Sequence, residues 1–253
     1  KNYPQQVGDC VSFGVKNAVE YLVAADGNRD FRDVHPSYFY GYARVNIGRG
    51  AVRGDGAVGA WGAKAAQEGG TLFLADNGVP AYSGSLARVW GKDGPPKAFI
   101  DIAKARRVKT IAPVKTAAQC RDAICNGYPV TVASMFGSTS IKERDGRMVA
   151  AKNTQWAHQM CCIGYDGRGP VAFFYILNSW GPSAHPQPLQ GEPPGGFWVT
   201  ADDMQWICST GDCWSFSDLD GFPARELDFN VFGQVPAKQG RAVADARKTQ
   251  VAL

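Results

Sequence analysis

Residues 173–181 read FFYILNSWG, an apolar run followed at once by a polar, glycine-containing turn. The aromatic and β-branched side chains of the first five residues are typical of a buried strand. Similar short runs at 130–135, 159–165 and 197–200 are separated by glycine and proline turns, so the second half of the chain is predicted to be rich in strands. An isolated Asn-Ser-Trp-Gly is most often an ordinary turn, and its meaning depends on the rest of the chain.

The first half of the chain carries helical patterns instead. Apolar residues recur at helical spacing over 11–22 until the pair Asp26-Gly27 ends the run. Further helices are expected at 58–67 and at 116–126, the latter ended by Gly127. Helices that come first and strands that come afterwards predict an α+β fold with two lobes, rather than alternating βαβ units.

The composition is that of an ordinary globular protein, with 253 residues of which 45% are hydrophobic and 20% charged. The net charge of +4 is not gathered in one segment with interleaved aromatic residues, so we expect no nucleic-acid partner. The longest apolar stretches, such as 170–177, are far shorter than the roughly 20 residues that cross a bilayer. We therefore expect no membrane partner, and the cellular compartment stays open.

The cysteines do not predict a metal site. Cys120 and Cys125, like Cys208 and Cys213, are separated by a four-residue gap, whereas most structural zinc sites use a tight two-residue gap. Local disulfides or free thiols are the expected state of these pairs, and we expect neither a metal nor a cofactor. The total of seven cysteines is odd, which leaves room for one reactive thiol.

Cys10 is the candidate for that reactive thiol because it lies at or just inside the N-terminus of the first helix. A thiol reacts as its thiolate, and the free N–H groups and the dipole of a helix N-terminus stabilise that anion. The thiol also needs a base, and the base needs a group that orients it. Of the three histidines, His35 and His185 precede prolines in loops, whereas His158 opens a strand and is held rigidly. His158 is thus the preferred base, although any single histidine is by default a core residue.

Three segments together resemble the papain family of cysteine peptidases. Residues 8–13 (GDCVSF) resemble the nucleophile segment, residues 158–165 (HQMCCIGY) resemble the histidine strand, and residues 178–181 (NSWG) are identical to the asparagine motif. Residues 195–199 (GGFWV) look like the glycine-aromatic strand that normally follows. The segments occur in the family's order and span roughly residues 5–216, which makes the resemblance specific.

The resemblance implies a papain-like two-lobed α+β fold in a single domain over 1–233. It implies a helical N-terminal lobe over about 8–108, a β-barrel-like C-terminal lobe over about 109–216 and an active-site cleft between them. A return segment would occupy 217–233. The polar, basic stretch 234–253 is expected to be a loosely held tail.

The resemblance also implies hydrolysis of peptide bonds in proteins or peptides, without a cofactor. Cys10 would be the nucleophile, His158 the base and Asn178 the residue that orients His158. Trp180 would shield the bond between Asn178 and His158 and border the substrate. A strongly lowered thiol pKa is a further expectation taken from the family.

The oxyanion site departs from the family pattern. The family uses a glutamine six residues before the cysteine, and that position is Pro4 in this chain. Gln5 or Gln6 would supply the side-chain donor, and the two alternatives remain open. Asp9 also places a carboxylate next to the thiol, where its charge opposes formation of the thiolate, although as an N-cap it favours the helix.

Substrate contacts and a surface insertion are the remaining expectations. Asp55 and Gly56 correspond to the glycine-containing segment along which a substrate backbone pairs, and Ala133 corresponds to the strand end that lines the main substrate pocket. Ordinary turn and core roles are equally compatible with these residues. The proline-rich segment 185–194 is expected either to form a rim over the cleft or to be an inert surface loop.

Two other functions stay open. The first alternative to the peptidase is a catalytically impaired relative that binds partners in a larger assembly, with the tail after Gln234 as a contact. The second is a Cys-His amidase or transglutaminase-like enzyme. The irregular glutamine position motivates the first alternative. The intact Asn178 motif favours the peptidase over the second.

Overall fold

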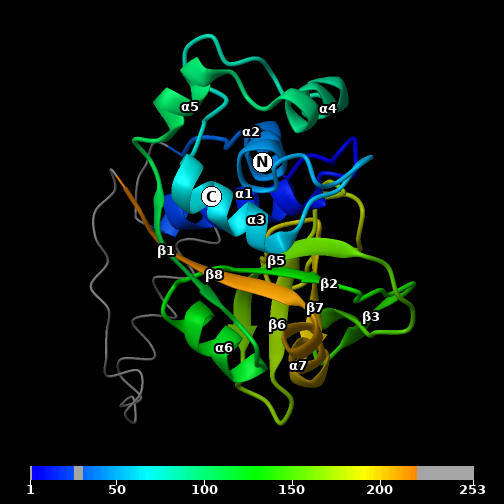
Figure 1. The fold of residues 1–253 in the computed structure, drawn as a ribbon. Helices are drawn as coiled ribbons and strands as arrows, with labels where there is room; N and C mark the ends of the chain where they lie inside the picture. Colours follow the sequence, from blue (N-terminus) through cyan, green and yellow to red (C-terminus); the bar gives the residue numbers. More distant parts are fainter. Residues whose placement is uncertain (1, 26–30, 221–253) are drawn as a thin grey trace.

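The computed structural model describes residues 2–25 and 31–220. Helices dominate the first part of the described chain, where they form a helical lobe (Figure 1). Its α-helices are α1 (Cys10–Ala25), α2 (Pro36–Gly41), α3 (Gly59–Lys64), α4 (Gly84–Asp93) and α5 (Lys97–Ala103). Two π-helical turns, η1 (Tyr42–Ile47) and η2 (Ala65–Gly69), continue α2 and α3.

The rest of the described chain forms one eight-stranded sheet in the order β1-β8-β2-β5-β6-β7-β4-β3. The strands are β1 (Val108–Pro113), β2 (Val130–Ser134), β3 (Ile141–Arg144), β4 (Arg147–Ala150), β5 (His158–Asp166), β6 (Phe173–Leu177), β7 (Gly196–Thr200) and β8 (Asp212–Leu219). Neighbouring strands are antiparallel except for β4 and β7, which are parallel. The order does not join β1 to β3, so the expected β-barrel-like lobe is an open sheet.

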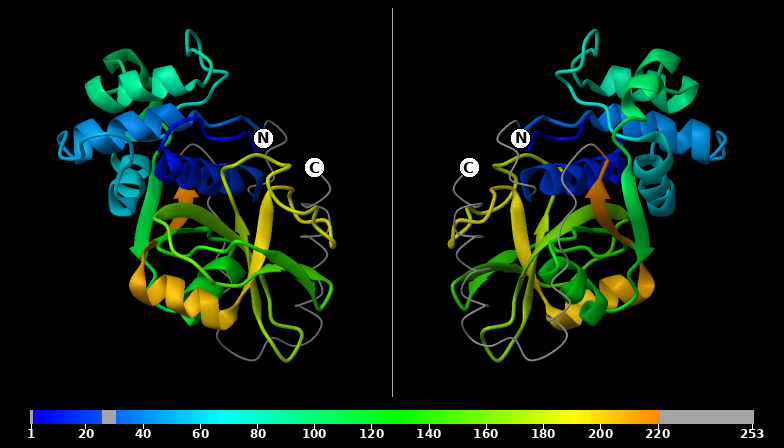
Figure 2. Two further views of the ribbon diagram at one scale, coloured as in Figure 1. Left: turned by 90° about the vertical axis from the view of Figure 1, so that its right-hand side faces the viewer. Right: turned by 90° about the vertical axis from the view of Figure 1, so that its left-hand side faces the viewer.

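Two helices, α6 (Ala117–Cys125) and α7 (Ala201–Thr210), accompany the sheet on the side away from the helical lobe. Figure 2 shows the same division from two further sides, with the helical lobe at one end, the sheet at the other and the dark-blue α1 at the boundary between them. The α+β prediction is therefore confirmed.

The local helix signals also match. Thr116 caps α6 by accepting the Gln119 N–H, and Gly127 has the left-handed φ of 78° expected at a helix stop.

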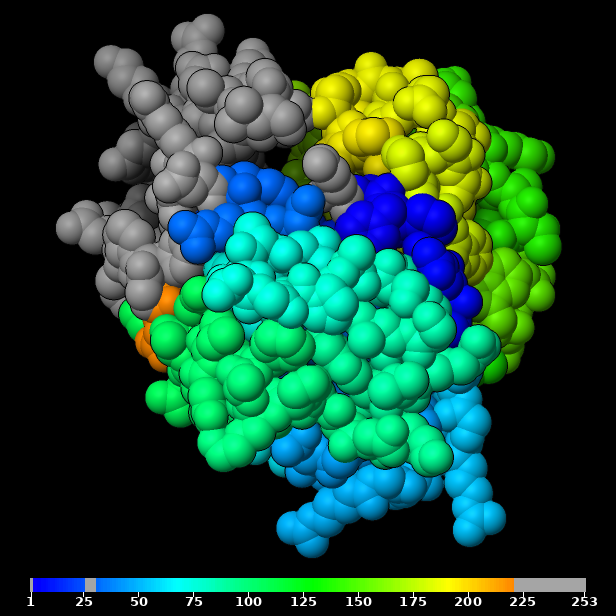
Figure 3. Space-filling view, turned by 90° about the horizontal axis from the view of Figure 1, so that it is seen from above, coloured from blue at the N-terminus to red at the C-terminus, as the bar shows by residue number. Residues whose placement is uncertain are grey.

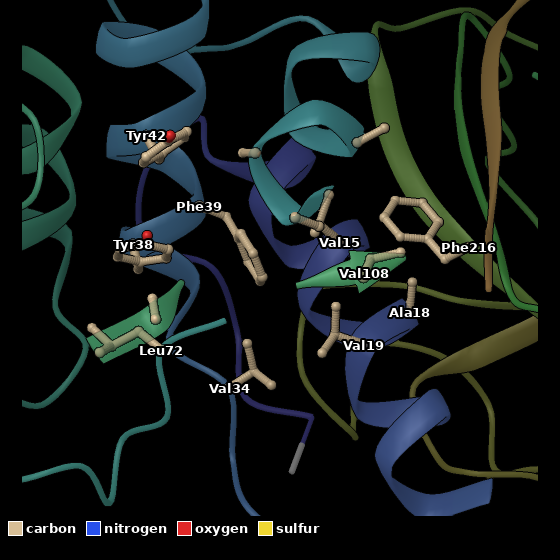
Figure 4. Packing of buried hydrophobic residues seen from close by; sticks show 14 of the residues in the cluster. Val15, Ala18, Val19, Val34, Tyr38, Phe39, Tyr42, Leu72, Val108 and Phe216 are labelled. Carbon is tan, nitrogen blue, oxygen red and sulfur yellow. The ribbon is translucent and has the colours of Figure 1, made fainter. Parts of the chain in front are cut away.

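Helix α1 lies between the two lobes, which explains why it is buried on almost every face. Val15, Ala18 and Val19 pack in one cluster with Phe39 of α2 and Phe216 of β8 (Figure 4). Because β8 returns from the end of the described chain to insert between β1 and β2, it closes the core over α1. The first residue of α1 is thereby held at the junction of the lobes.

A second core fills the sheet lobe, and four cysteines meet in it. Their side chains come from α6, β5, α7 and β8, and they are Cys120, Cys162, Cys208 and Cys213. All seven cysteines are free thiols in the structure. No group of three or more histidine, cysteine or acidic side chains among the described residues is arranged to hold a metal ion.

Parts of the sequence-based account fall outside the described chain. The predicted tail at 234–253 and most of the return segment 217–233 lie beyond residue 220. Among the described helices, none is both long enough and apolar enough to cross a membrane.

Candidate active site

Cys10 is the first residue of α1 and is half-buried. The helix begins here because the Asp9 carbonyl accepts the N–H groups of Ser12 (3.0 Å) and Phe13 (3.2 Å). The backbone N–H of Gln159, the second residue of β5, hydrogen-bonds to the Cys10 sulfur. The thiol therefore lies against the start of the strand that His158 opens.

His158 and Asn178 are joined directly. The Nε2 atom of His158 lies 2.7 Å from Oδ1 of Asn178, and both side chains are buried. The N–H of Ser179 also donates to that oxygen, at 2.7 Å. Trp180 stacks on the imidazole with the ring centroids 5.0 Å apart and an interplanar angle of 29°. The imidazole thus has one face covered and one nitrogen bound, which limits its rotation.

Burial sets the direction of the His158 pKa. Removal from water lowers the pKa of His158, while its hydrogen bond to Asn178 opposes the change. With Nε2 bound to an oxygen, the proton of the neutral ring lies on Nε2 and the Nδ1 atom carries the lone pair. Such a ring can accept a proton through Nδ1.

The Cys10 thiol differs from the family expectation. Burial raises the pKa of Cys10 above its ordinary value, and the negative charge of Asp9 adds to the rise. Hydrogen bonding from the Gln159 N–H acts in the opposite direction but is outweighed. The strongly lowered thiol pKa implied by the resemblance is therefore absent from this arrangement while His158 is neutral.

Asp9 precedes the first residue of α1 and is fully buried. Its Oδ2 accepts the Tyr82 hydroxyl at 3.0 Å, so the expected capping of α1 by its side chain is replaced by a bond to the helical lobe. Burial raises the pKa of Asp9 to about 7, although the Tyr82 hydrogen bond acts against this. Asp9 consequently changes charge in the neutral pH range.

The two candidate oxyanion glutamines point in different directions. Gln5 is bound to the Asn178 turn, since its N–H donates to the Ser179 carbonyl at 2.8 Å and its Oε1 accepts the Ser179 hydroxyl. Gln6 instead accepts the Gly84 N–H at the start of α4, at 2.8 Å. In Figure 3 the dark-blue N-terminal segment lies against the yellow segment that follows β6. Gln5 is therefore the glutamine beside the candidate site.

The candidate substrate segment at Asp55 and Gly56 lies next to the nucleophile segment. Asp55 accepts the Gly8 N–H at 3.3 Å and forms an exposed ion pair with Arg88. Gly56 has a φ of 110°, which favours glycine. Arg44, a residue that the sequence did not single out, holds this loop by donating to the backbone carbonyls at 52, 54 and 56.

A pocket of about 210 Å³ opens beside the imidazole. His158, Asn178, Trp180 and His185 are among its lining residues. Of the proline-rich segment 185–194, His185 and Pro186 line this pocket.

Ala133 lies elsewhere, in the middle of the sheet. It pairs with Gln159 of β5 and Asp212 of β8. Ala133 belongs to β2 and lies opposite the start of β5, on the side of the site where Cys10 lies. It does not line the pocket beside His158.

His185 is the residue that sequence reasoning set aside. Its Nε2 atom lies 2.8 Å from Nδ2 of Asn178, and its ring contacts Trp180 and Phe197. The only local signal was a histidine before a proline, which is typical of a loop. Its place beside Asn178 follows from the tertiary fold.

Comparison with known proteins supports the architecture. No family model and no curated protein sequence matches the chain. Among solved structures, xylellain, a cysteine protease from Xylella fastidiosa, superposes with a TM-score of 0.62 at 17% identity over 85% of this chain and 82% of its own.

Two proforms are also similar. Digestive procathepsin L 3 of Tenebrio molitor larval midgut gives a TM-score of 0.56 at 14% identity over 89% of this chain. The proform of the ragweed pollen cysteine protease Amb a 11 gives 0.57 at 17% identity over 90%. The chain spans 66% and 63% of these two structures. At such identities the likeness concerns the fold alone, and the chain has the fold of the papain-like cysteine proteases.

Proposed function

We propose that the chain is a papain-like cysteine peptidase that hydrolyses peptide bonds through an acyl-enzyme. The observation that carries the proposal is the 2.7 Å bond between His158 and Asn178 beneath Trp180, at a strand end that borders the start of α1. A buried amide that orients an imidazole beside a helix-terminal thiol is the arrangement that activates a cysteine nucleophile.

In the first half-reaction the proton of Cys10 moves to Nδ1 of His158, and the resulting thiolate attacks the peptide carbonyl carbon. The carbonyl π electrons move to oxygen, and the tetrahedral intermediate collapses as His158 returns the proton to the departing amine. The products are a thioester on Cys10 and a free amine. Since the pKa of Cys10 is raised while His158 is neutral, the imidazolium formed in this transfer is the main source of thiolate stabilisation.

In the second half-reaction His158 removes a proton from water, and the hydroxide attacks the thioester carbonyl. Collapse of this intermediate breaks the C–S bond and releases a carboxylic acid, and His158 returns the proton to the departing sulfur, which restores the Cys10 thiol and the neutral imidazole. Asn178 holds Nε2 of His158 throughout, because the Nε2–H donates to Oδ1 in both protonation states of the ring.

Gln5 is our candidate for the side-chain donor to the oxyanion, together with the Cys10 N–H. Its Nε2 group donates one hydrogen to the Val7 carbonyl at 2.9 Å and carries a second hydrogen. Its anchorage on Ser179 would keep that group preorganised. Substituting Gln5 with alanine should lower kcat by roughly 100-fold, the typical cost of one oxyanion donor.

The proposal is tested by incubating the full chain with a peptide library and reading cleavage by mass spectrometry. The wild type should cleave peptides, Cys10→Ala should be inactive, and Cys125→Ala should match the wild type because it removes a half-buried thiol away from the site. Equal cleavage by Cys10→Ala and wild type would reject Cys10 as the nucleophile.

A catalytically impaired binding protein is the second candidate, and the raised pKa of Cys10 beside the buried Asp9 favours it. Under that candidate the library peptides are retained without being cut. Turnover of peptidoglycan fragments without peptide cleavage would instead indicate an amidase.

A further inference from the structure

Two imidazoles meet the same asparagine in this structure. Oδ1 of Asn178 lies 2.7 Å from Nε2 of His158, and Nδ2 of Asn178 lies 2.8 Å from Nε2 of His185. The Trp180 ring contacts both histidines, with centroids 5.0 Å from His158 and 5.8 Å from His185. The second histidine is thus part of the same cluster as the candidate base.

The orientation of the Asn178 amide follows from its backbone partner. The N–H of Ser179 can only donate, and it lies 2.7 Å from the amide atom that also faces His158, so that atom is the oxygen. The other end of the amide is therefore the NH₂ group, which can only donate. Consequently the Nε2 atom of His185 must be the acceptor, and the neutral His185 ring carries its proton on Nδ1.

The two rings are therefore expected in opposite tautomers. His158 carries its proton on Nε2 and offers Nδ1 to the thiol side, whereas His185 carries its proton on Nδ1 and offers Nε2 to Asn178. Rotation of the amide by half a turn would place two donors together at Ser179 and two acceptors at His185. Each bond therefore opposes rotation of the amide.

We propose that His185 is a positioning residue, which accepts a hydrogen bond from Asn178 and so holds the amide in the orientation that the base His158 needs. The proposal rests on the proposed function, because it gives His185 a role only through His158. Asn178 is buried, so loss of the acceptor would leave its NH₂ group without the partner it now has, at a cost in free energy.

The segment that carries His185 is attached to the sheet at several points. Glu192 accepts the Trp198 indole N–H at 2.6 Å, and Gln190 donates to the Gly146 carbonyl at 3.0 Å. The His185 ring also meets Phe197 of β7 edge-on, at 5.1 Å. These contacts hold the imidazole in place against Asn178.

The electrostatic environment keeps His185 in the accepting form. Burial lowers the pKa of His185, and the nearby His158 lowers it further. A protonated His185 would carry N–H groups on both nitrogens and could no longer accept from Asn178. Only the neutral form of His185 can therefore accept the hydrogen bond from the Asn178 NH₂ group.

The first test reads the tautomers by ¹⁵N NMR of histidine side chains in the wild type and in the inactive Cys10→Ala protein. With three histidines in the chain, each signal is assigned from the corresponding single substitution. We expect His158 protonated on Nε2 and His185 on Nδ1. A His185 ring with its proton on Nε2 would overturn the proposal, and this result does not depend on whether any peptide is cleaved.

The second test compares three variants of the segment. His185→Leu removes the acceptor, His185→Gln can place Oε1 where Nε2 now lies, and Gln187→Leu changes an exposed neighbour as the control. We expect His185→Leu to lower kcat about tenfold, the equivalent of one net hydrogen bond, with little change in KM. His185→Gln should recover most of the loss, and the control should match the wild type.

An Asn178→Ala background separates positioning from a direct role. If His185 acts through Asn178, adding His185→Leu to Asn178→Ala should cause no further loss of kcat. Equal losses in the Leu and Gln variants, or a further loss in the Asn178→Ala background, would contradict the proposal. Should the Leu variant fail to fold, the tautomers of the wild type still decide. If the wild type cleaves no peptide, the proposed function fails while the NMR test stands.

Discussion

At the scale of single residues, the most unusual feature is the buried carboxyl of Asp9 next to Cys10. Its Oδ2 atom accepts the Tyr82 hydroxyl at 3.0 Å, and its Oδ1 atom is buried with no hydrogen-bond partner among the described residues. Burial raises the pKa of Asp9 to about 7, so the group is neutral in mild acid and negative in mild base. Its charge raises the pKa of the adjacent thiol.

Substituting Asp9 with asparagine should therefore make Cys10 more reactive, but only where Asp9 would be ionised. At about pH 5 the two proteins should react with iodoacetamide at similar rates. At about pH 8 the variant should react up to roughly tenfold faster, the effect of a thiol pKa lower by about one unit. Asp93→Asn, which removes an exposed charge on α4, serves as the control. A rate ratio that does not change with pH would count against this role of Asp9.

The sequence predicted some site residues and missed others for physical reasons. His158 opens β5 and Asn178 directly follows β6, and these strands pair antiparallel, so motif order and pairing bring the two residues together. Gln5 and Gln6 could not be separated because the choice depends on contacts with Ser179 and Gly84, far along the chain. His185 was discarded because its loop position hides a tertiary contact.

At the scale of elements, α1 contains a buried ion pair. The Lys16 ammonium lies 2.7 Å from Glu20, with only 1% and 10% of the two side chains exposed. Glu20 also accepts the Val34 N–H at 2.9 Å, which links α1 to the short bridge between Val34 and Phe73. The pair thus joins the central helix to the rest of the helical lobe.

Glu20→Ala should lower the free energy of unfolding by about 3 to 5 kcal/mol, because it removes the carboxylate that faces a buried ammonium. The double substitution Lys16→Met, Glu20→Leu should recover much of that loss. Asp101→Ala breaks an exposed pair of the same spacing on α5, with Lys97, and should cost at most about 1 kcal/mol. Urea unfolding measures the free energy of unfolding of each variant. Equal losses in Glu20→Ala and Asp101→Ala would show that the buried pair contributes no more to stability than the exposed pair.

Elements with strong local signals were the predictable ones. Helix α1 shows helical spacing and a clear stop, and α6 has a threonine cap and Gly127. Helix α4 was missed although Ser83 caps it and Gly94 follows it, because its apolar face is sparse. Strand β8 could not be placed because its partners β1 and β2 are remote in sequence.

At the scale of the whole molecule, the candidate site depends on how closely α1 approaches β5. Gln159 donates to the Val11 carbonyl at 2.9 Å, and a side chain on Gly14 would lie 2.8 Å from the Gln159 amide and 3.1 Å from the Met160 carbonyl. Only glycine permits this approach. The contact sets the position of Cys10 relative to His158.

Gly14→Ala should therefore push the lobes apart. We expect a loss of about 1 to 3 kcal/mol in stability together with a lower rate of Cys10 alkylation. Adding Gln159→Ala removes two of the three atoms that the new methyl group would meet. The double variant should therefore regain part of the lost stability and part of the lost alkylation rate. An unchanged stability and an unchanged rate of Cys10 alkylation in Gly14→Ala would show that the close approach of α1 to β5 does not control the position of Cys10.

The two-lobed plan followed from the order of helices and strands, whereas the open sheet and the path of β8 between β1 and β2 did not. Pairing between distant strands is decided by packing of the whole core, which local patterns do not encode. The division into lobes was predictable; the way in which β8 closes the core over α1 was not.

We propose that Cys10, His158 and Asn178 together form a working acyl-transfer centre. Its most direct test is the intact mass of the full chain after incubation at neutral pH with an epoxide inhibitor of papain-like enzymes, with Cys10→Ala and Asn178→Ala as comparisons. We expect one adduct in the wild type, located on Cys10, none in Cys10→Ala and slower labelling in Asn178→Ala. Failure of the epoxide to label Cys10, while iodoacetamide still alkylates it, would show that these three residues do not form an acyl-transfer centre.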